Sequence, residues 1–150
     1  MENTKQIDDE LSVAMGQPTA EQLQQAAKEG FKSVLNLRSP QEEGFVSDEQ
    51  QQAEAAGLKY VNLPVKPDGM NDELTDRILQ EIERLPKPAL IHCKSGMRSG
   101  VMTLMSVATD RGMTASEALA MGKQNGFDYD ANPQMKQFFE HYVSTHDRVG

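Results

Sequence analysis

The chain has 150 residues, of which 37% are hydrophobic and 25% charged, as expected for one ordinary globular domain. A net charge of -8 argues against the basic surface that nucleic-acid binding or docking on anionic lipid needs, so backbone amides and arginines must form any anion site locally. Residues 1–13 lack the features of a secretory signal, and no apolar run approaches the roughly 20 residues of a membrane span. A cytoplasmic location is predicted, unless a leader has been removed.

Apolar, β-branched segments alternate along the chain with segments of helical periodicity. Strands are predicted at 11–15, 31–37, 58–65 and 89–93. Helices are predicted between a Thr19 cap and Gly30, between a Ser47 cap and Gly57, from an Asn71 cap to near Leu85, from near Ser99, near 115–124 and near 132–145. This order predicts an α/β three-layer sandwich with a mostly parallel sheet of four or five strands. Neither a repeat nor a linker interrupts it, so residues 1–150 are expected to form one domain.

The stretch PALIHCKSGMRSG, residues 88–100, holds the only cysteine, Cys93. Sites in open α/β sheets form at the carboxyl ends of strands, and a helix start there offers unpaired amides and a favourable dipole to an anion. Gly96 permits a tight curl of the loop, and Arg98 supplies a planar fork for an oxyanion.

The same features favour the thiolate form of Cys93, with a pKa well below the usual value of about 8.5. Ser99 is placed to hydrogen-bond the sulfur and to stabilise it as a leaving group. A lone cysteine at a strand end is more commonly a buried small hydrophobe. The combination of strand, glycine, arginine, serine and helix favours a reactive thiol instead. The three histidines are scattered, so no zinc site is indicated and no cofactor is predicted.

Three polar residues have two interpretations each. His92 is a candidate for a catalytic Cys-His pair or for a support of the loop; adjacent strand residues face opposite sides, so it is expected to bond backbone and hold the loop in shape. Lys94 adds positive potential at the mouth or is simply solvated. Arg38 ends the strand at 31–37 and either binds an anionic substrate or pairs with Glu42 or Glu43.

Phosphoryl transfer would need a general acid to protonate the leaving oxygen. Asp68, in the loop after the strand at 58–65, is the first candidate, and its alternative role is that of a turn former. Asp72 is the second candidate; a negative charge is also favourable in the first turn of a helix.

The cysteine loop resembles the signature of cysteine-based protein tyrosine phosphatases, closest to the atypical dual-specificity group. GQPTAEQLQQAAKEGFKSVLNLRSPQEE, AAGLKYVNLPV and the loop itself are similar to the bacterial β-lactamase hydrolase-like phosphatase domain, over about residues 11 to 112. The resemblance implies Cys93 as nucleophile, Arg98 as oxyanion clamp and Ser99 as helper of the sulfur. Amides of the remaining loop residues would bind the anion: Lys94, Ser95, Gly96 and Met97. It also places Asp68 in the loop that carries the general acid.

One feature departs from that signature. Five residues separate cysteine and arginine in the phosphatases, and four do here. Rhodanese-type sulfurtransferases resemble this shorter loop and carry a persulfide on cysteine. Three functions therefore stay open: a phosphatase acting through a phosphocysteine, a sulfurtransferase, and a non-catalytic anion-binding module. The predicted partner is a phosphorylated small molecule or phosphoprotein.

Overall fold

The computed structural model describes residues 3–66 and 70–146. Five strands form one sheet in the order β1-β2-β5-β3-β4, with β1 antiparallel to β2 and the other pairs parallel. The strands are β1 (Thr4–Gln6), β2 (Leu11–Ala14), β3 (Ser33–Asn36), β4 (Lys59–Asn62) and β5 (Ala89–His92). The predicted mostly parallel α/β sheet is confirmed.

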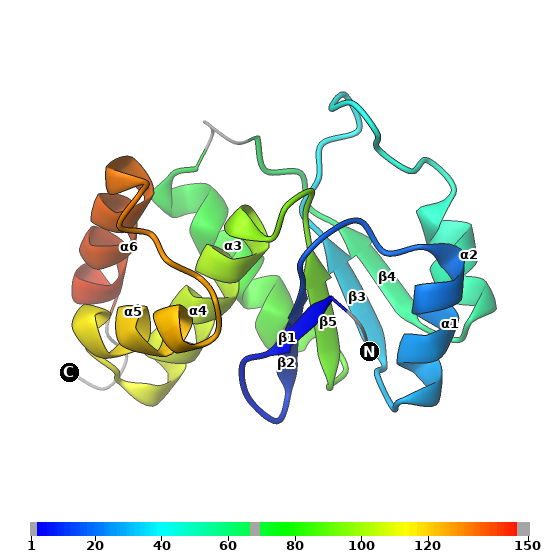
Figure 1. Ribbon diagram of the computed structural model, residues 1–150, viewed down its shortest axis with the longest axis horizontal. Coiled ribbons are helices and arrows are strands. Elements are labelled where there is room, and N and C mark those ends of the chain that lie inside the picture. The colour runs from blue at the N-terminus through cyan, green and yellow to red at the C-terminus, as the bar shows by residue number, and fades with distance from the viewer. Residues whose placement is uncertain (1–2, 67–69, 147–150) are drawn as a thin grey trace.

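Helices cover both faces of the sheet, as Figure 1 shows: α1 and α2 lie on one side and α3 and α4 on the other, with α5 and α6 outside α4. The helices are α1 (Ala20–Lys28), α2 (Glu49–Ala55), α3 (Asp72–Arg84), α4 (Met97–Arg111), α5 (Ala115–Gln124) and α6 (Pro133–Thr145). The three-layer arrangement follows from strands that are apolar on both faces, since a parallel sheet must be covered on each.

Two hydrophobic clusters fill the spaces between the layers. Val34 and Leu90 belong to the cluster under α1 and α2. Leu35 and Ile91, the next residue of each strand, belong to the larger cluster under α4. Side chains of a strand alternate between faces. His92 therefore shares the face of α2, and Cys93 shares the face of α4.

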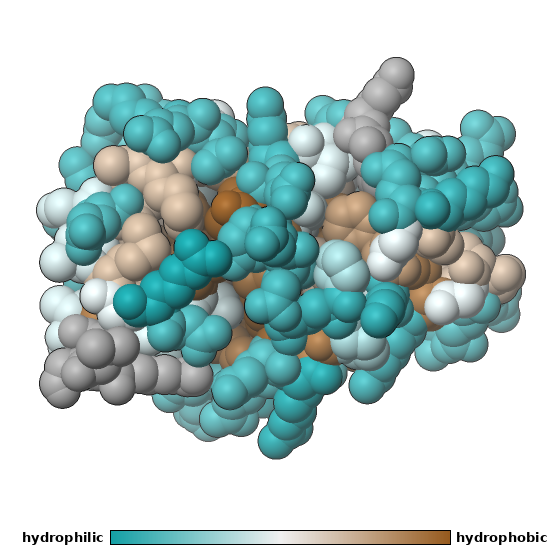
Figure 2. Space-filling view, turned by 90° about the horizontal axis from the view of Figure 1, so that it is seen from below, coloured by the Kyte–Doolittle hydropathy of each residue, from teal (hydrophilic) through white to brown (hydrophobic). Residues whose placement is uncertain are grey.

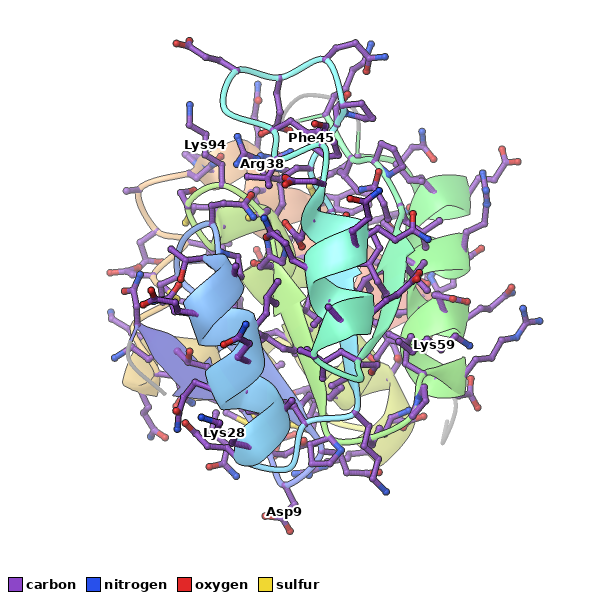
Figure 3. All side chains as sticks on the ribbon, turned by 90° about the vertical axis from the view of Figure 1, so that its right-hand side faces the viewer. Asp9, Lys28, Arg38, Phe45, Lys59 and Lys94 are labelled. Atoms are coloured by element: carbon purple, nitrogen blue, oxygen red, sulfur yellow. The ribbon has the colours of Figure 1, made fainter. Side chains whose placement is uncertain are left out.

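The carboxyl ends of the four parallel strands lie in one row. His92, the last residue of β5, pairs with Ala14 on one side and Asn36 on the other, and Asn36 pairs with Asn62. The segments that follow β2, β3, β4 and β5 therefore leave the sheet at one edge. In Figure 3 the labelled Arg38, Phe45 and Lys94 gather at this end of the molecule.

Three local predictions need correction. The edge strand β1 was not predicted, because its sequence Thr-Lys-Gln has no apolar alternation; it is held by antiparallel pairing and by the Asp8 turn, whose carboxylate accepts the Leu11 N–H at 2.8 Å. Helix α2 starts after Asp48 without a side-chain cap, so the expected Ser47 cap is wrong. Helix α4 starts at Met97, earlier than the expected start near Ser99.

Figure 2 views the molecule from below relative to Figure 1, and the surface on that side is largely hydrophilic. Figure 2 shows apolar side chains there as patches between polar ones. Within the described ranges, none of the helices combines the length and apolar character that a bilayer crossing requires.

Candidate active site

Cys93 follows β5 directly and is fully buried. Its sulfur accepts the Gly96 N–H at 3.2 Å and the Ser99 N–H at 3.5 Å, and the Ser99 hydroxyl oxygen lies 3.4 Å from it. Three polar groups from the loop and the first turn of α4 thus converge on one sulfur atom. Hydrogen bonds to the charged form favour that form, so this arrangement suits a thiolate.

Gly96 shapes this convergence. It is the N-cap of α4 and has a φ of 94°, in the left-handed region that favours glycine. An added Cβ would also lie 3.1 Å from the Met15 sulfur. The left-handed turn carries the chain into α4, which begins at Met97, four residues after Cys93. Lys94 and Ser95 are exposed, and Met97 is half-buried as the first residue of the helix.

Arg98 is held by the loop that follows β3. Its Nη1 and Nη2 donate to the two carboxylate oxygens of Glu42, at 2.9 and 3.1 Å, and Nη1 also donates to the Val65 carbonyl oxygen at 2.5 Å. The Arg98 side chain is 8% exposed and that of Glu42 is 17% exposed. Such a bidentate pair fixes the plane of the guanidinium as well as its position.

Electrostatics reinforce this pair. The hydrogen bond from Arg98 lowers the pKa of Glu42 from 4.5 to about 2, against the opposing effect of burial. Burial lowers the pKa of Arg98, but the hydrogen bond to Glu42 and the negative charge of Cys93 raise it more, so its net shift is upward. Its bidentate pair with Glu42 therefore keeps Arg98 protonated at the start of α4.

Arg38 lies behind Glu42 and is only 2% exposed. It donates to Glu42 Oε2 at 3.0 Å and to the carbonyl oxygens of Glu43 and Gly44 at 2.6 and 3.1 Å. Its Nη1 also donates to the Gln17 side-chain oxygen at 2.7 Å. The structure therefore brings Arg38 to the site as a support of the Glu42 loop, the second of its two interpretations. The Arg38 guanidinium is buried and bound to these groups, so it is not exposed for the other interpretation, direct contact with an anionic substrate.

His92 lies on the opposite side of the sheet from the Cys93 sulfur. Its Nε2 is 2.6 Å from Glu49 Oε2, at the start of α2, and both side chains are fully buried. Its Nδ1 lies 3.3 Å from the Cys93 carbonyl oxygen. Glu49 also accepts a hydrogen bond from the Gln17 amide. His92 contacts backbone at the base of the loop and makes no hydrogen bond to the thiol within the described structure.

These contacts form one continuous chain of hydrogen bonds around the cysteine loop. It runs through six side chains: His92, Glu49, Gln17, Arg38, Glu42 and Arg98. No sequence motif predicts Glu49 as the partner of His92, or Gln17 as the link between Glu49 and Arg38. Their spacing is set by the order of the strands rather than by any local motif.

The two candidate general acids differ in their placement. Asp68 lies outside the described residues. Asp72 is the first residue of α3 and lies 3.8 Å from His141 of α6, which fits its alternative role in the first turn of a helix. No group of three acidic, histidine or cysteine side chains suited to a metal ion occurs in residues 3–66 and 70–146.

In this three-layer fold a cysteine directly follows a parallel strand, and a short loop leads from it to an arginine at the start of a helix. This combination defines the protein tyrosine phosphatase-like class of fold. Comparison with known families gives the same result. Residues 3–110 match the family described as "Beta-lactamase hydrolase-like protein, phosphatase-like domain", and the chain belongs to that family.

Longer bacterial proteins are among its relatives. The β-lactamase hydrolase-like protein of Xylella fastidiosa is 31% identical over 125 residues, which cover 81% of this chain and 29% of that protein. The protein of the same name from Agrobacterium fabrum is 28% identical over 148 residues, covering 89% of this chain and 34% of that protein. The chain thus spans about a third of the length of these relatives or less.

Solved structures share the fold at low sequence identity. A cysteine-to-serine variant of P. aeruginosa TpbA in complex with pTyr is 18% identical, with a TM-score of 0.77 over 98% of this chain and 89% of that one. The core catalytic domain of the S. cerevisiae PP-IP phosphatase SIW14, in complex with citrate, is 20% identical, with a TM-score of 0.75 over 96% and 90%. These similarities extend along nearly the whole of the described fold.

Proposed function

We propose that this chain is a cysteine-dependent phosphatase that hydrolyses a phosphate monoester through a phosphocysteine intermediate. The observation that carries the proposal is the convergence of the Gly96 and Ser99 N–H groups and the Ser99 hydroxyl on the Cys93 sulfur. Arg98 lies next to it with a fixed guanidinium. The family, and the phosphatases that share the fold, support the same reaction class.

In the first step the Cys93 thiolate attacks phosphorus, a sulfur–phosphorus bond forms, and the bond to the leaving oxygen breaks. The negative charge of the transferring group is stabilised by backbone N–H groups at the start of α4 and by Arg98. The three hydrogen bonds to Glu42 and Val65 use Nη hydrogens, so the Nε–H and the second Nη2 hydrogen of Arg98 serve the anion.

In the second step water attacks phosphorus, the sulfur–phosphorus bond breaks, inorganic phosphate is released, and the proton lost by the water passes to the Asp68 carboxylate left by the first step. The Ser99 hydroxyl, 3.4 Å from the sulfur, donates to the thiolate as it leaves. Asp68 is the proposed proton donor to the leaving oxygen in the first step. The substrate is a phosphorylated small molecule or phosphoprotein, because a phosphotyrosine complex and a PP-IP phosphatase both occur among the proteins that share the fold.

An aryl phosphate assay tests this proposal. Wild type should turn over and be inhibited by vanadate, whereas Cys93→Ser should have no activity. Arg98→Lys should lose most of the activity, because the compact ammonium group of lysine cannot replace the planar guanidinium that binds an oxyanion through two N–H groups. Asp68→Asn should slow poor leaving groups more than good ones. Ordinary turnover by Cys93→Ser would rule the mechanism out.

The four-residue spacing between Cys93 and Arg98 favours sulfur transfer as the second candidate function. The Cys93 sulfur would then carry one further sulfur atom, taken from a donor such as thiosulfate and passed to an acceptor such as cyanide. Intact mass before and after thiosulfate treatment tests it. Sulfate binding with neither turnover nor a mass change would instead favour a non-catalytic anion-binding module.

A further inference from the structure

Tyr129 carries a buried hydroxyl with an unusual environment. The residue is 2% exposed. Its hydroxyl oxygen is the one buried side-chain polar atom, among those of residues 3–66 and 70–146, that has no hydrogen-bond partner. An unsatisfied buried hydroxyl destabilises a fold, whereas phenylalanine would fill the same space without that cost. An unpaired hydroxyl at a buried position therefore indicates a use for that group.

The hydroxyl lies against the first turn of α4. A Cβ added to Gly100 would lie 2.8 Å from this oxygen and 2.6 Å from the ring of Phe127. Gly100 directly follows Ser99, whose N–H and hydroxyl both contact the Cys93 sulfur. The absence of a side chain at Gly100 thus lets the phenol approach the turn that surrounds the sulfur.

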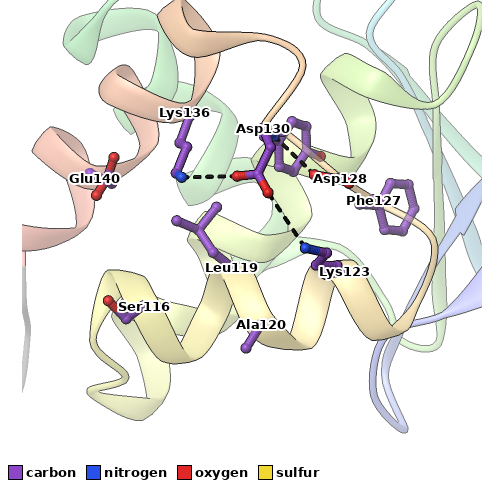
Figure 4. Close-up of a pocket in the computed structure, with 10 residues that line it drawn as sticks. Ser116, Leu119, Ala120, Lys123, Phe127, Asp128, Asp130, Lys136 and Glu140 are labelled. Carbon is purple, nitrogen blue, oxygen red and sulfur yellow. Dashed lines mark hydrogen bonds and ion pairs between the residues drawn. The ribbon is translucent and has the colours of Figure 1, made fainter.

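The segment that carries Tyr129 is firmly fixed. Phe127 and Tyr129 point inward, while Asp128 and Asp130 are exposed. Asp130 binds Lys136 of α6 at 2.9 Å and Lys123 of α5 at 3.5 Å, as the dashed lines in Figure 4 show. The Tyr129 carbonyl oxygen accepts the Asn132 N–H at 3.0 Å. The contacts of the α5–α6 connection therefore hold the Tyr129 ring in place.

The charge state of the phenol is also fixed. Burial raises the pKa of Tyr129 far above its usual value of 10, and the negative charge of Cys93 raises it further. The hydroxyl therefore keeps its proton at any working pH. It is a permanent, neutral hydrogen-bond donor within electrostatic reach of the sulfur.

We propose that Tyr129 is a positioning residue for the Cys93 thiolate: its hydroxyl donates toward the sulfur from the side of α4 through one bound water. The Gly96 and Ser99 N–H groups bind the sulfur from the loop and helix start. Tyr129 adds a donor from a separate part of the chain. The inference rests on the reactive thiol of the proposed function, and holds equally for phosphoryl or sulfur transfer.

Tyr129→Phe tests the proposal, with the pH dependence of Cys93 alkylation by iodoacetamide as the readout. Loss of a donor to the thiolate should raise the thiol pKa. At one pH unit below the wild-type thiol pKa, alkylation should be about 3- to 10-fold slower in the variant. The melting temperature should change little, because phenylalanine fills the same buried space as the tyrosine ring.

Tyr142→Phe is the matched control. The Tyr142 hydroxyl, on α6, donates to Asp76 at 2.5 Å, so this variant should melt earlier than wild type while its alkylation profile stays the same. Superimposable alkylation profiles of Tyr129→Phe and wild type would overturn the proposal and leave Tyr129 a packing residue. A profile shifted equally by both variants would overturn it as well.

Incorporation of 3-fluorotyrosine at position 129 keeps the test valid if Tyr129→Phe does not fold. Fluorine makes the phenol a stronger donor, so the thiol pKa should fall and alkylation below that pKa should become faster, the opposite of the phenylalanine effect. An unchanged alkylation rate would overturn the proposal. Because alkylation needs no substrate turnover, an absence of phosphatase activity would defeat the proposed function without deciding the role of Tyr129.

Discussion

Glu42 binds Arg98 through both carboxylate oxygens, at 2.9 and 3.1 Å, across 56 residues of sequence. The loop after β3 thereby fixes the orientation of an arginine at the start of α4. Glu42 is itself held by the Ser39 N–H at 2.8 Å and by Arg38 at 3.0 Å. Because the Glu42 carboxylate is held from two sides, the Arg98 guanidinium has one orientation. Its remaining N–H donors are therefore already in position when an anion binds.

Glu42→Gln should weaken turnover more than it weakens folding. The amide cannot accept both Nη groups, so Arg98 loses its fixed plane, and misplacement of a binding group costs about 10- to 100-fold in rate. We expect a fall of that size in kcat/KM for an aryl phosphate. Glu43→Gln is the control, because the side chain of Glu43 is exposed, and it should stay within about twofold of wild type. Equal effects of the two variants would contradict the role of Glu42.

The same ion pair predicts an acid dependence of stability. The pKa of Glu42 falls from 4.5 to about 2 on folding, so the unfolded chain binds this proton first as pH drops. Stabilisation by the pair is complete above pH 4.5 and is lost as pH falls toward 2. The difference in melting temperature between wild type and Glu42→Gln should therefore be constant from neutral pH to about 5 and shrink below it. A difference that grew in acid would have the wrong sign for this pair.

The fully buried pair of Glu49 and His92 predicts a large effect on folding. Glu49→Ala leaves His92 and Gln17 without their partner and should cost about 3 kcal/mol or more in the free energy of unfolding. Glu49→Gln keeps a hydrogen-bonding side chain in place and should cost less, on the order of 1–2 kcal/mol. Urea denaturation measures both. Glu54→Gln, on an exposed position of α2, should change little, and an Ala variant as stable as this control would contradict the argument.

How far the sequence determines this site differs between its parts. The loop itself could be predicted, because strand, Cys93, Gly96, Arg98 and helix are neighbours in the chain, and their order fixes where they lie. The contacts of Glu42 and Glu49 could not. They arise from the row in which β2, β3, β4 and β5 end, and the strand order that creates this row is not readable from local periodicity.

The elements show the same division. Strands with strong apolar character and helices capped by Thr19 and Asn71 were predicted correctly, since both signals are local. β1 has polar side chains and forms only by pairing with β2. The start of α4 at Met97 depends on the left-handed turn at Gly96, which a hydrophobic pattern does not reveal.

Gly100→Ala should destabilise the fold through a steric conflict under the cysteine loop. Its Cβ would meet the Phe127 ring at 2.6 and 2.7 Å and the Tyr129 hydroxyl at 2.8 Å. Both aromatic residues are buried, so relief requires a shift of α4 or of the α5–α6 connection, at a cost of about 1–3 kcal/mol. The same shift would move the Ser99 N–H away from the Cys93 sulfur and slow alkylation of the thiol.

Gly122→Ala is the matched comparison for that variant. This glycine is also buried in a helix, and its Cβ would lie 2.6 Å from Leu104 Cδ1. That methyl group is the end of a flexible side chain, which can rotate away more easily than a packed ring. Both variants gain about 1 kcal/mol of helix propensity, so the difference between them isolates the steric conflict. In urea denaturation, Gly100→Ala should have a lower free energy of unfolding than Gly122→Ala. The reverse order would contradict the argument, because it would mean that the α5–α6 connection moves easily and does not fix the first turn of α4.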